Sequence, residues 1–112
     1  MSIDWRAFLL ASLLVTGAVP ARAEDSATVA LTIKDHRFEP AELKVPAGKP
    51  FVITVKNLDG TAEEFESRAL KIEKVIAGRS DGTVRVHALA PGRYEFIGEY
   101  HSDTAKGALI AE

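Results

Sequence analysis

A glutamate and a histidine near the end of the chain have a spacing that would let them bind one metal ion. Glu99 and His101 are two residues apart, and in an extended segment side chains at that spacing point to the same side. An imidazole nitrogen and a carboxylate oxygen are common ligands of divalent metals. The alternative is an exposed pair in a solvated loop. Taken alone, the Glu-x-His motif favours that alternative.

Three glutamates form an acidic cluster in the middle of the chain: Glu63, Glu64 and Glu66. Carboxylates this close repel one another, which costs stability unless a cation or a base neutralises them. A solvated acidic turn is the alternative, and clusters of this kind are usually that. Glu63 has the opposite parity to the other two, so we do not expect all three to face one metal. We favour Glu63 and Glu66 over Glu64 as ligands.

The remaining histidines are His36 and His87. His36 precedes Phe38 and Pro40, and the ligand and surface interpretations are evenly balanced for it. His87 lies on a strand-like segment and is expected to be exposed.

Composition excludes several classes of function. The chain has no cysteine, so it has no disulfide, no thiolate ligand and no thiol catalysis. No Ser-His-Asp arrangement is recognisable, so a hydrolase has no support. The formal net charge is −2, and no basic cluster suggests nucleic acid as a partner.

The first residues have the features of a secretory signal peptide. Arg6 precedes an apolar run over residues 7–19, and Ala21-Arg22-Ala23 provides a cleavage pattern. The run is about 13 residues, shorter than the ~20 that a permanent transmembrane helix needs. We therefore predict a signal peptide over residues 1–23, a mature domain over 24–112, and a periplasmic location without membrane insertion after cleavage.

The mature part reads as a series of short strands separated by turns, which predicts an all-β sandwich. Residues 38–48 contain Pro40, Pro46 and Gly48, so this stretch is expected to cross from one sheet to the other. The strands are expected near residues 29–34, 51–56, 70–76, 83–88, 93–97 and 106–111.

The order and spacing of several motifs resemble a cupredoxin, which implies a Greek-key β-sandwich. The motifs are Phe38-x-Pro40, Val45-Pro-Ala-Gly48, Phe51-x-Ile-x-Val-x-Asn57 and Leu89-x-Pro-Gly-x-Tyr94-x-Phe96. Blue-copper cupredoxins hold their metal with two histidines, a cysteine and usually a methionine. The resemblance places His101 at the second histidine, Gly98 at the cysteine, Glu63 at or next to the first histidine, and Lys106 near the methionine. Without the thiolate, blue-copper electron transfer is not expected.

The substituted positions resemble a narrower group. Glu63-Glu-Phe-Glu66-Ser, Gly98-Glu-Tyr-His101 and Asp35-His-Arg-Phe38 are similar to the cupredoxin-like domains of the EfeO type and their stand-alone relatives, which accompany a membrane iron permease. The resemblance implies that the protein binds copper or iron and assists oxidation of ferrous iron or its delivery to the permease. A ferroxidase-type activity is left open. The implied metal site comprises Glu63, Glu66, Glu99 and His101, with His36 as a further candidate.

Two other functions remain as alternatives. One is a metal-free β-sandwich module that docks a partner through its acidic end, and the other is a periplasmic copper carrier. An oxygen-rich site with one or two imidazoles suits Cu(II), iron or Mn(II) and disfavours Cu(I), which prefers sulfur.

Overall fold

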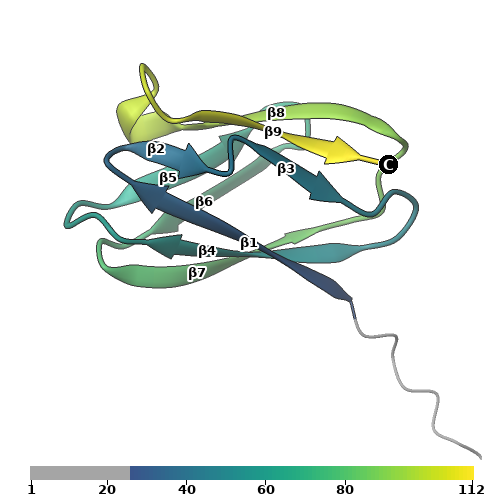
Figure 1. Ribbon diagram of the computed structural model, residues 1–112, viewed down its shortest axis with the longest axis horizontal. Coiled ribbons are helices and arrows are strands. Elements are labelled where there is room, and N and C mark those ends of the chain that lie inside the picture. The colour runs from purple at the N-terminus through teal and green to yellow at the C-terminus, as the bar shows by residue number, and fades with distance from the viewer. Residues whose placement is uncertain (1–25) are drawn as a thin grey trace, which may run out of the picture.

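The computed structural model describes residues 26–112, which form two β-sheets packed face to face (Figure 1). The four-stranded sheet has the order β2-β1-β4-β7 and the five-stranded sheet the order β3-β9-β8-β5-β6. The elements are β1 Ala27–Lys34, β2 Arg37–Glu39, β3 Glu42–Val45, β4 Phe51–Asn57, β5 Glu63–Ser67, β6 Ile72–Ile76, β7 Ser80–Val86, β8 Gly92–Gly98, the 3₁₀ helix η1 Glu99–His101 and β9 Lys106–Ala111. The predicted all-β sandwich is confirmed.

The interior strands of the smaller sheet follow the alternation of their sequences. In β4, Phe51, Ile53 and Val55 are buried between the sheets, while the residues between them face outward. β4 pairs in parallel with β1 and antiparallel with β7. Its β-branched residues suit a strand with neighbours on both sides.

The segment with two prolines does cross between the sheets, as predicted. Its first part is β2, at one edge of the smaller sheet, and its second part is β3, at one edge of the larger sheet. Both are edge strands, where the missing N–H group of a proline costs no hydrogen bond of the sheet. β3 lies parallel to the last strand, β9.

Three aromatic rings join the sheets at the centre of the core. Phe38 of β2 meets Phe96 of β8 edge to face at 4.9 Å between ring centroids. Phe65 of β5 stacks on Phe96 at 4.8 Å. All three side chains are buried, so β5 and β8 are fixed against the smaller sheet.

The acidic cluster lies in a strand, where the sequence suggested a loop. Residues 63–67 form β5, which pairs with β6 and with the end of β8. Glu63, Phe65 and Ser67 are buried, and Glu64 and Glu66 point to the other face. The sequence Glu-Glu-Phe-Glu-Ser alternates polar and apolar residues only weakly, because a glutamate occupies a buried position.

A buried asparagine fixes the connection from β4 to β5. The Nδ2 group of Asn57 donates hydrogen bonds to the carbonyl oxygens of Thr61, Ile76 and Ala77. Its Oδ1 atom accepts a hydrogen bond from the backbone N–H of Asp59. One side chain thus ties the β4–β5 loop to the end of β6.

The predicted signal peptide, residues 1–23, lies outside the described residues. Within 26–112 no helix has both the length and the apolar character required to span a bilayer.

Replacing Asn57 by Asp tests this connection. The substitution removes the amide donor and points a carboxylate oxygen at three carbonyls, so we expect a loss of about 2–3 kcal/mol in the free energy of unfolding. Urea denaturation measures it, with Lys56→Ala, an exposed neighbour on β4, as the control. A loss below about 0.5 kcal/mol, the usual size of a surface effect, would contradict this role.

Candidate metal centre

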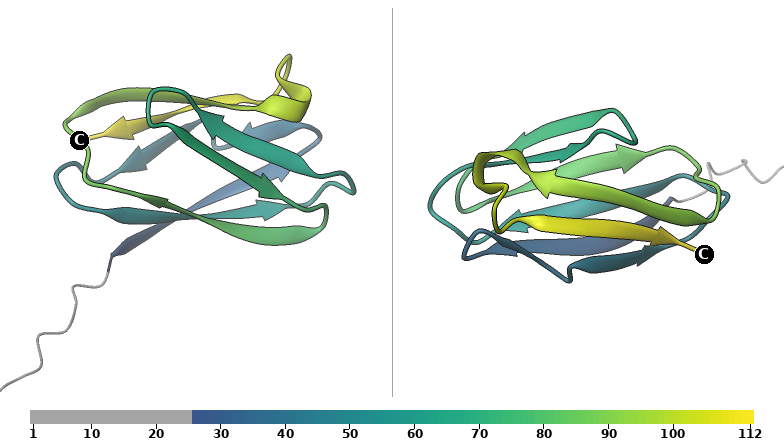
Figure 2. Two further views of the ribbon diagram at one scale, coloured as in Figure 1. Left: turned by 180° about the vertical axis from the view of Figure 1, so that it is seen from behind. Right: turned by 90° about the horizontal axis from the view of Figure 1, so that it is seen from above.

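Three segments that are far apart in the sequence meet at one end of the sandwich. They are the turn at residues 35–36 between β1 and β2, the loop at residues 58–62 after β4, and η1 after β8. Figures 1 and 2 show them at the end opposite the C-terminus. At this end Glu63, His101 and His36 come together, and Glu99 is also part of η1.

Glu63 is the central residue of this end and is only 1% exposed. Its Oε1 atom accepts hydrogen bonds from the backbone N–H groups of Glu64, at 3.0 Å, and of Tyr100, at 2.9 Å. Its Oε2 atom lies 2.6 Å from Nδ1 of His101. A buried carboxylate needs compensating partners, and these three contacts supply them.

His101 is held on both sides. Its Nδ1 atom faces Glu63, and its ring stacks on the ring of His36, with centroids 3.6 Å apart and planes 11° from parallel. The His101 side chain retains 24% exposure. Two imidazoles and a carboxylate therefore share one partly open site.

The position of His36 depends on Asp59. Both Asp35 and His36 have positive φ angles, 54° and 57°, a conformation that non-glycine residues adopt at a cost. The two carboxylate oxygens of Asp59 accept the backbone N–H groups of Asp35 and His36 at 2.8 and 2.9 Å. Thr104 adds a hydrogen bond from its hydroxyl to the His36 carbonyl at 2.6 Å. Burial tends to raise the pKa of Asp59, but these backbone hydrogen bonds outweigh it and leave the pKa below the ordinary value.

Glu66 and Glu99 lie apart from this group. We expected Glu99 and His101 to point to the same side because they are two residues apart in an extended segment. That expectation is wrong, because Glu99–His101 is a turn of 3₁₀ helix, in which residues two apart point in different directions. Glu66 is on the opposite face of β5 from Glu63, and its Oε1 atom is buried without a hydrogen-bond partner.

The outward-facing glutamates form a cluster of their own. The neighbouring Glu99 carboxyl group, followed by burial, raises the pKa of Glu66. Burial and the nearby charge of Glu73 raise the pKa of Glu64. The structure thus separates the five predicted residues into a buried group, Glu63, His101 and His36, and an outer pair, Glu66 and Glu99.

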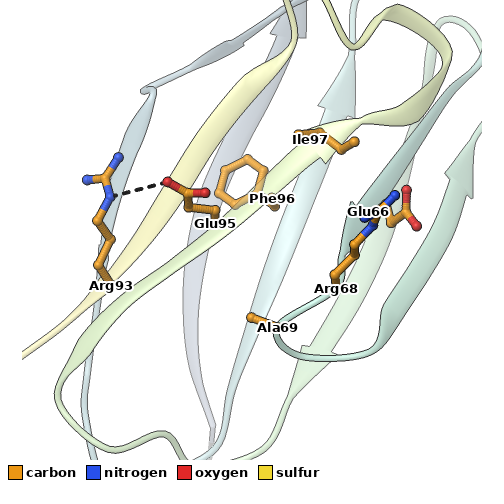
Figure 3. A pocket seen from close by; sticks show the side chains of 7 residues that line it. All are labelled: Glu66, Arg68, Ala69, Arg93, Glu95, Phe96 and Ile97. Carbon is orange, nitrogen blue, oxygen red and sulfur yellow. Dashed lines mark ion pairs between the residues drawn. The ribbon is translucent and has the colours of Figure 1, made fainter.

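One hollow of the described residues lies away from the buried group. It has a volume of about 530 Å³ and lies on the outer face of the larger sheet, where Glu66, Arg68 and Ile97 line it (Figure 3). Arg93 and Glu95 form an ion pair at 3.8 Å on its other side. The hollow therefore combines an ion pair with a glutamate whose Oε1 atom has no hydrogen-bond partner.

The donor atoms present decide which metal centre the chain could form. Blue copper requires a thiolate, and the chain has no cysteine, so that centre does not fit. Nor do three histidine or acidic side chains within 26–112 already converge as a complete set of ligands. The buried carboxylate and the two imidazoles fit a non-thiolate centre, which would have to be completed by movement of side chains or by water.

Sequence reasoning missed the residues that position the site. Asp59 lies in a turn-like Asn-Leu-Asp-Gly segment, which by itself suggested only a turn. Its carboxylate oxygens accept hydrogen bonds from two residues of the β1–β2 turn, which lie 23 and 24 positions earlier in the sequence. Only the packing of β4 beside β1 makes that contact possible.

Replacing Asp59 by Ala should release the turn that carries His36. We expect a loss of about 1–2 kcal/mol in the free energy of unfolding, because two backbone hydrogen bonds lose their acceptor. NMR spectra should also show the His36 and His101 ring signals moving toward those of unstacked imidazoles. Asp59→Asn keeps one acceptor oxygen and should give an intermediate result, and Asp81→Ala on β7 is the control. Unchanged ring signals in Asp59→Ala would show that the stack does not depend on Asp59.

The outer pair should make stability depend on pH. Because the pKa of Glu66 is raised in the folded protein, its contribution is fully present below the ordinary glutamate pKa and is lost as pH rises through the folded value. In the wild-type protein the free energy of unfolding should therefore decrease as pH rises above the ordinary glutamate pKa, and in Glu66→Gln this decrease should be smaller. Urea denaturation at a series of pH values measures it. Glu39→Gln, an exposed carboxylate of β2, controls for the loss of one charge. An unchanged pH profile in Glu66→Gln would contradict the effect of Glu99 on the pKa of Glu66.

Comparison with solved structures finds proteins of the same fold, two of which are described as binding copper. The metal-binding domain of the Cu(I)-exporting P-type ATPase CopA of Streptococcus pneumoniae, solved with Cu(I), has a TM-score of 0.67 at 18% identity and covers 76% of this chain and 84% of its own. Auracyanin A, a blue copper protein of Chloroflexus aurantiacus, has a TM-score of 0.64 at 18% identity, and the match covers 79% of this chain and 100% of auracyanin A. Amicyanin of Paracoccus versutus has a TM-score of 0.57 at 16% identity, and the match covers 84% of this chain and 85% of amicyanin. At these identities the likeness shows the fold alone.

Sequence comparison identifies the family. An uncharacterised protein of Rickettsia prowazekii (strain Madrid E) is 40% identical over 82 residues, which are 73% of this chain and 66% of that protein. The family model for the cupredoxin-like domain matches residues 7–111. The chain therefore belongs to the cupredoxin-like domain family.

Proposed function

We propose that this protein is an exported metal-binding cupredoxin that holds Cu(II) or iron between Glu63 and His101. The observation that carries the proposal is the 2.6 Å approach of Glu63 Oε2 to His101 Nδ1, with His36 stacked beside them. A carboxylate and an imidazole that share a proton can instead share a cation, since both must lose protons to bind a metal. His36 is the nearest additional imidazole.

The ligand types indicate which ions suit the site. Carboxylate oxygen and imidazole nitrogen favour Cu(II) and iron over Cu(I). Carboxylates also favour a trivalent over a divalent ion. If the site bound Fe(III) more strongly than Fe(II) by ~2.8 kcal/mol, the equilibrium would shift toward oxidation about a hundredfold, because 1.4 kcal/mol corresponds to a factor of ten.

We propose further that the metal serves iron uptake in the periplasm, by assisting oxidation of ferrous iron or its delivery to a membrane permease. The support is the resemblance of the Glu63–Ser67 and Gly98–His101 motifs to EfeO-type domains, together with the signal-peptide pattern of residues 1–23. A copper carrier is less well supported, because the site offers no sulfur.

A metal-free docking module is the second candidate. It is favoured by the fact that no complete ligand set is already assembled in residues 26–112. Tyr100 of η1 is also 51% exposed beside the buried site, where a partner protein could contact it.

Metal titration of the protein from residue 24 onward separates these candidates. We expect one equivalent of Cu(II) to bind at micromolar concentration or tighter, and Glu63→Ala and His101→Ala each to weaken binding by about 10–100-fold or more. The matched control is His87→Ala, which removes an exposed histidine beyond the opposite end of β7. Absence of binding to the wild-type protein, or equal binding by His101→Ala, would favour the docking module.

The outer pair is tested in the same titration. If Glu66 and Glu99 are ligands, as the resemblance implies, the double variant Glu66→Ala/Glu99→Ala should also lose affinity. From the geometry we expect a much smaller loss than for Glu63→Ala. An equal loss would show that metal binding brings the outer pair into the site.

Iron oxidation is a separate measurement. Consumption of Fe(II) under oxygen should be faster with the Cu(II)-loaded protein than with the same concentration of Cu(II)-loaded His101→Ala. Equal rates would remove the oxidation role and leave iron delivery as the proposed role.

A further inference from the structure

Position 98 is a buried glycine with no room for any side chain. A Cβ atom built on Gly98 would lie 2.6 Å from Cδ and 2.8 Å from Oε2 of Glu63, and 2.6 Å from Cβ of Ala105. Non-bonded carbon atoms pack at about 3.5–4.0 Å. The carboxylate of Glu63 therefore fills the space that a side chain at position 98 would enter.

Neither neighbour can withdraw easily. The Glu63 carboxylate is buried and has three hydrogen-bonding partners, so moving it would leave a buried charge without partners. Ala105 is fully buried, and its carbonyl accepts the backbone N–H of Gly98 at 2.8 Å. Its Cβ therefore cannot shift without moving the backbone of this loop.

We infer that Glu63 and Gly98 form a mutually dependent pair that determines the class of metal this site accepts. With a carboxylate at position 63, no side chain fits at position 98, and that is the position where the fold would place a thiolate. The site can present the carboxylate or a thiolate, but not both. The pair thus commits the protein to an oxygen and nitrogen centre for oxidised ions and excludes a thiolate centre for Cu(I) or blue copper.

The inference concerns more than the absence of a cysteine. If Gly98 were simply a lost ligand, restoring cysteine there would restore the thiolate centre. In this structure the restored side chain would collide with Glu63, so restoration requires a second change at position 63. The specificity claim, that the pair determines the class of metal, rests on the proposed metal site. The packing claim, that the Glu63 carboxylate occupies the space of a side chain at position 98, stands without it.

The packing claim is tested by a double-mutant cycle that needs no metal. Gly98→Ala should lower the thermal unfolding midpoint of the wild-type protein by about 4–24 °C, because overpacking of a core costs about 1–3 kcal/mol and each kcal/mol shifts a small domain by about 4–8 °C. In the Glu63→Ala background the same substitution should lower the midpoint less, because only its contact with the Cβ of Ala105 remains. Glu63→Asp, which shortens the side chain but keeps the charge, should relieve Gly98→Ala in part and serves if Glu63→Ala folds poorly.

Gly107→Ala provides the matched control. A Cβ there would meet Phe96 and the Ala41 carbonyl at 2.6 and 2.8 Å, and neither contact involves Glu63. Its effect should be the same with and without Glu63→Ala. Gly98→Ala could instead lower the thermal unfolding midpoint as much in Glu63→Ala and Glu63→Asp as in the wild type. In that case Ala105 alone requires glycine at position 98, and the inference is overturned.

The specificity claim is tested by adding Cu(II) to Gly98→Cys/Ala105→Gly and to Gly98→Cys/Ala105→Gly/Glu63→Ala and recording visible spectra, because Ala105→Gly removes the other contact at position 98. We expect the intense copper–thiolate absorption only in the variant in which Glu63 is also replaced. The same strong absorption in Gly98→Cys/Ala105→Gly would overturn the inference, and so would its absence from the folded triple variant. If the wild-type protein binds no metal while the stability cycle shows coupling, the proposed function fails and the mutual dependence of the two positions stands.

Discussion

The contact between the Glu63 carboxylate and the His101 imidazole is the interaction on which this end of the protein depends. A glutamate that is 1% exposed would be costly to bury if it lacked partners. Its hydrogen bond from the backbone N–H of Tyr100 fixes the start of η1, and its contact with His101 fixes the ring that stacks on His36. The same carboxylate, together with the Cβ of Ala105, leaves no space for a side chain at position 98.

The rest of the fold supports this contact through a hierarchy of hydrogen bonds. Asn57 ends β4 and organises the loop that contains Asp59. Asp59 then holds the β1–β2 turn, and that turn presents His36 to His101. The aromatic core around Phe96 keeps β5 and β8 together, so that Glu63 on β5 can reach the residues that follow β8. The scaffold therefore brings a buried carboxylate and two imidazoles together at one end of the sandwich.

The sequence allowed the fold to be predicted well and the site only in part. Alternating segments such as residues 51–56 identify strands directly, and the two prolines marked the crossing from β2 to β3. Glu63, His101 and His36 do meet, as their predicted positions in the fold implied. The grouping of Glu66 and Glu99 with them was not observed, because the face of β5 and the short helix η1 are set by tertiary packing. Asp59 was missed because its partners are distant in the sequence.

The most direct test of the central claim is electron paramagnetic resonance of the Cu(II)-loaded protein, with detection of coupling to imidazole nitrogen. If Cu(II) sits between Glu63 and His101, the spectrum will show a site without thiolate ligation and with imidazole nitrogen coupling that is lost or reduced in His101→Ala and unchanged in His87→Ala. A Cu(II) spectrum that is identical in wild type and His101→Ala would contradict the account, because the metal would then lie elsewhere.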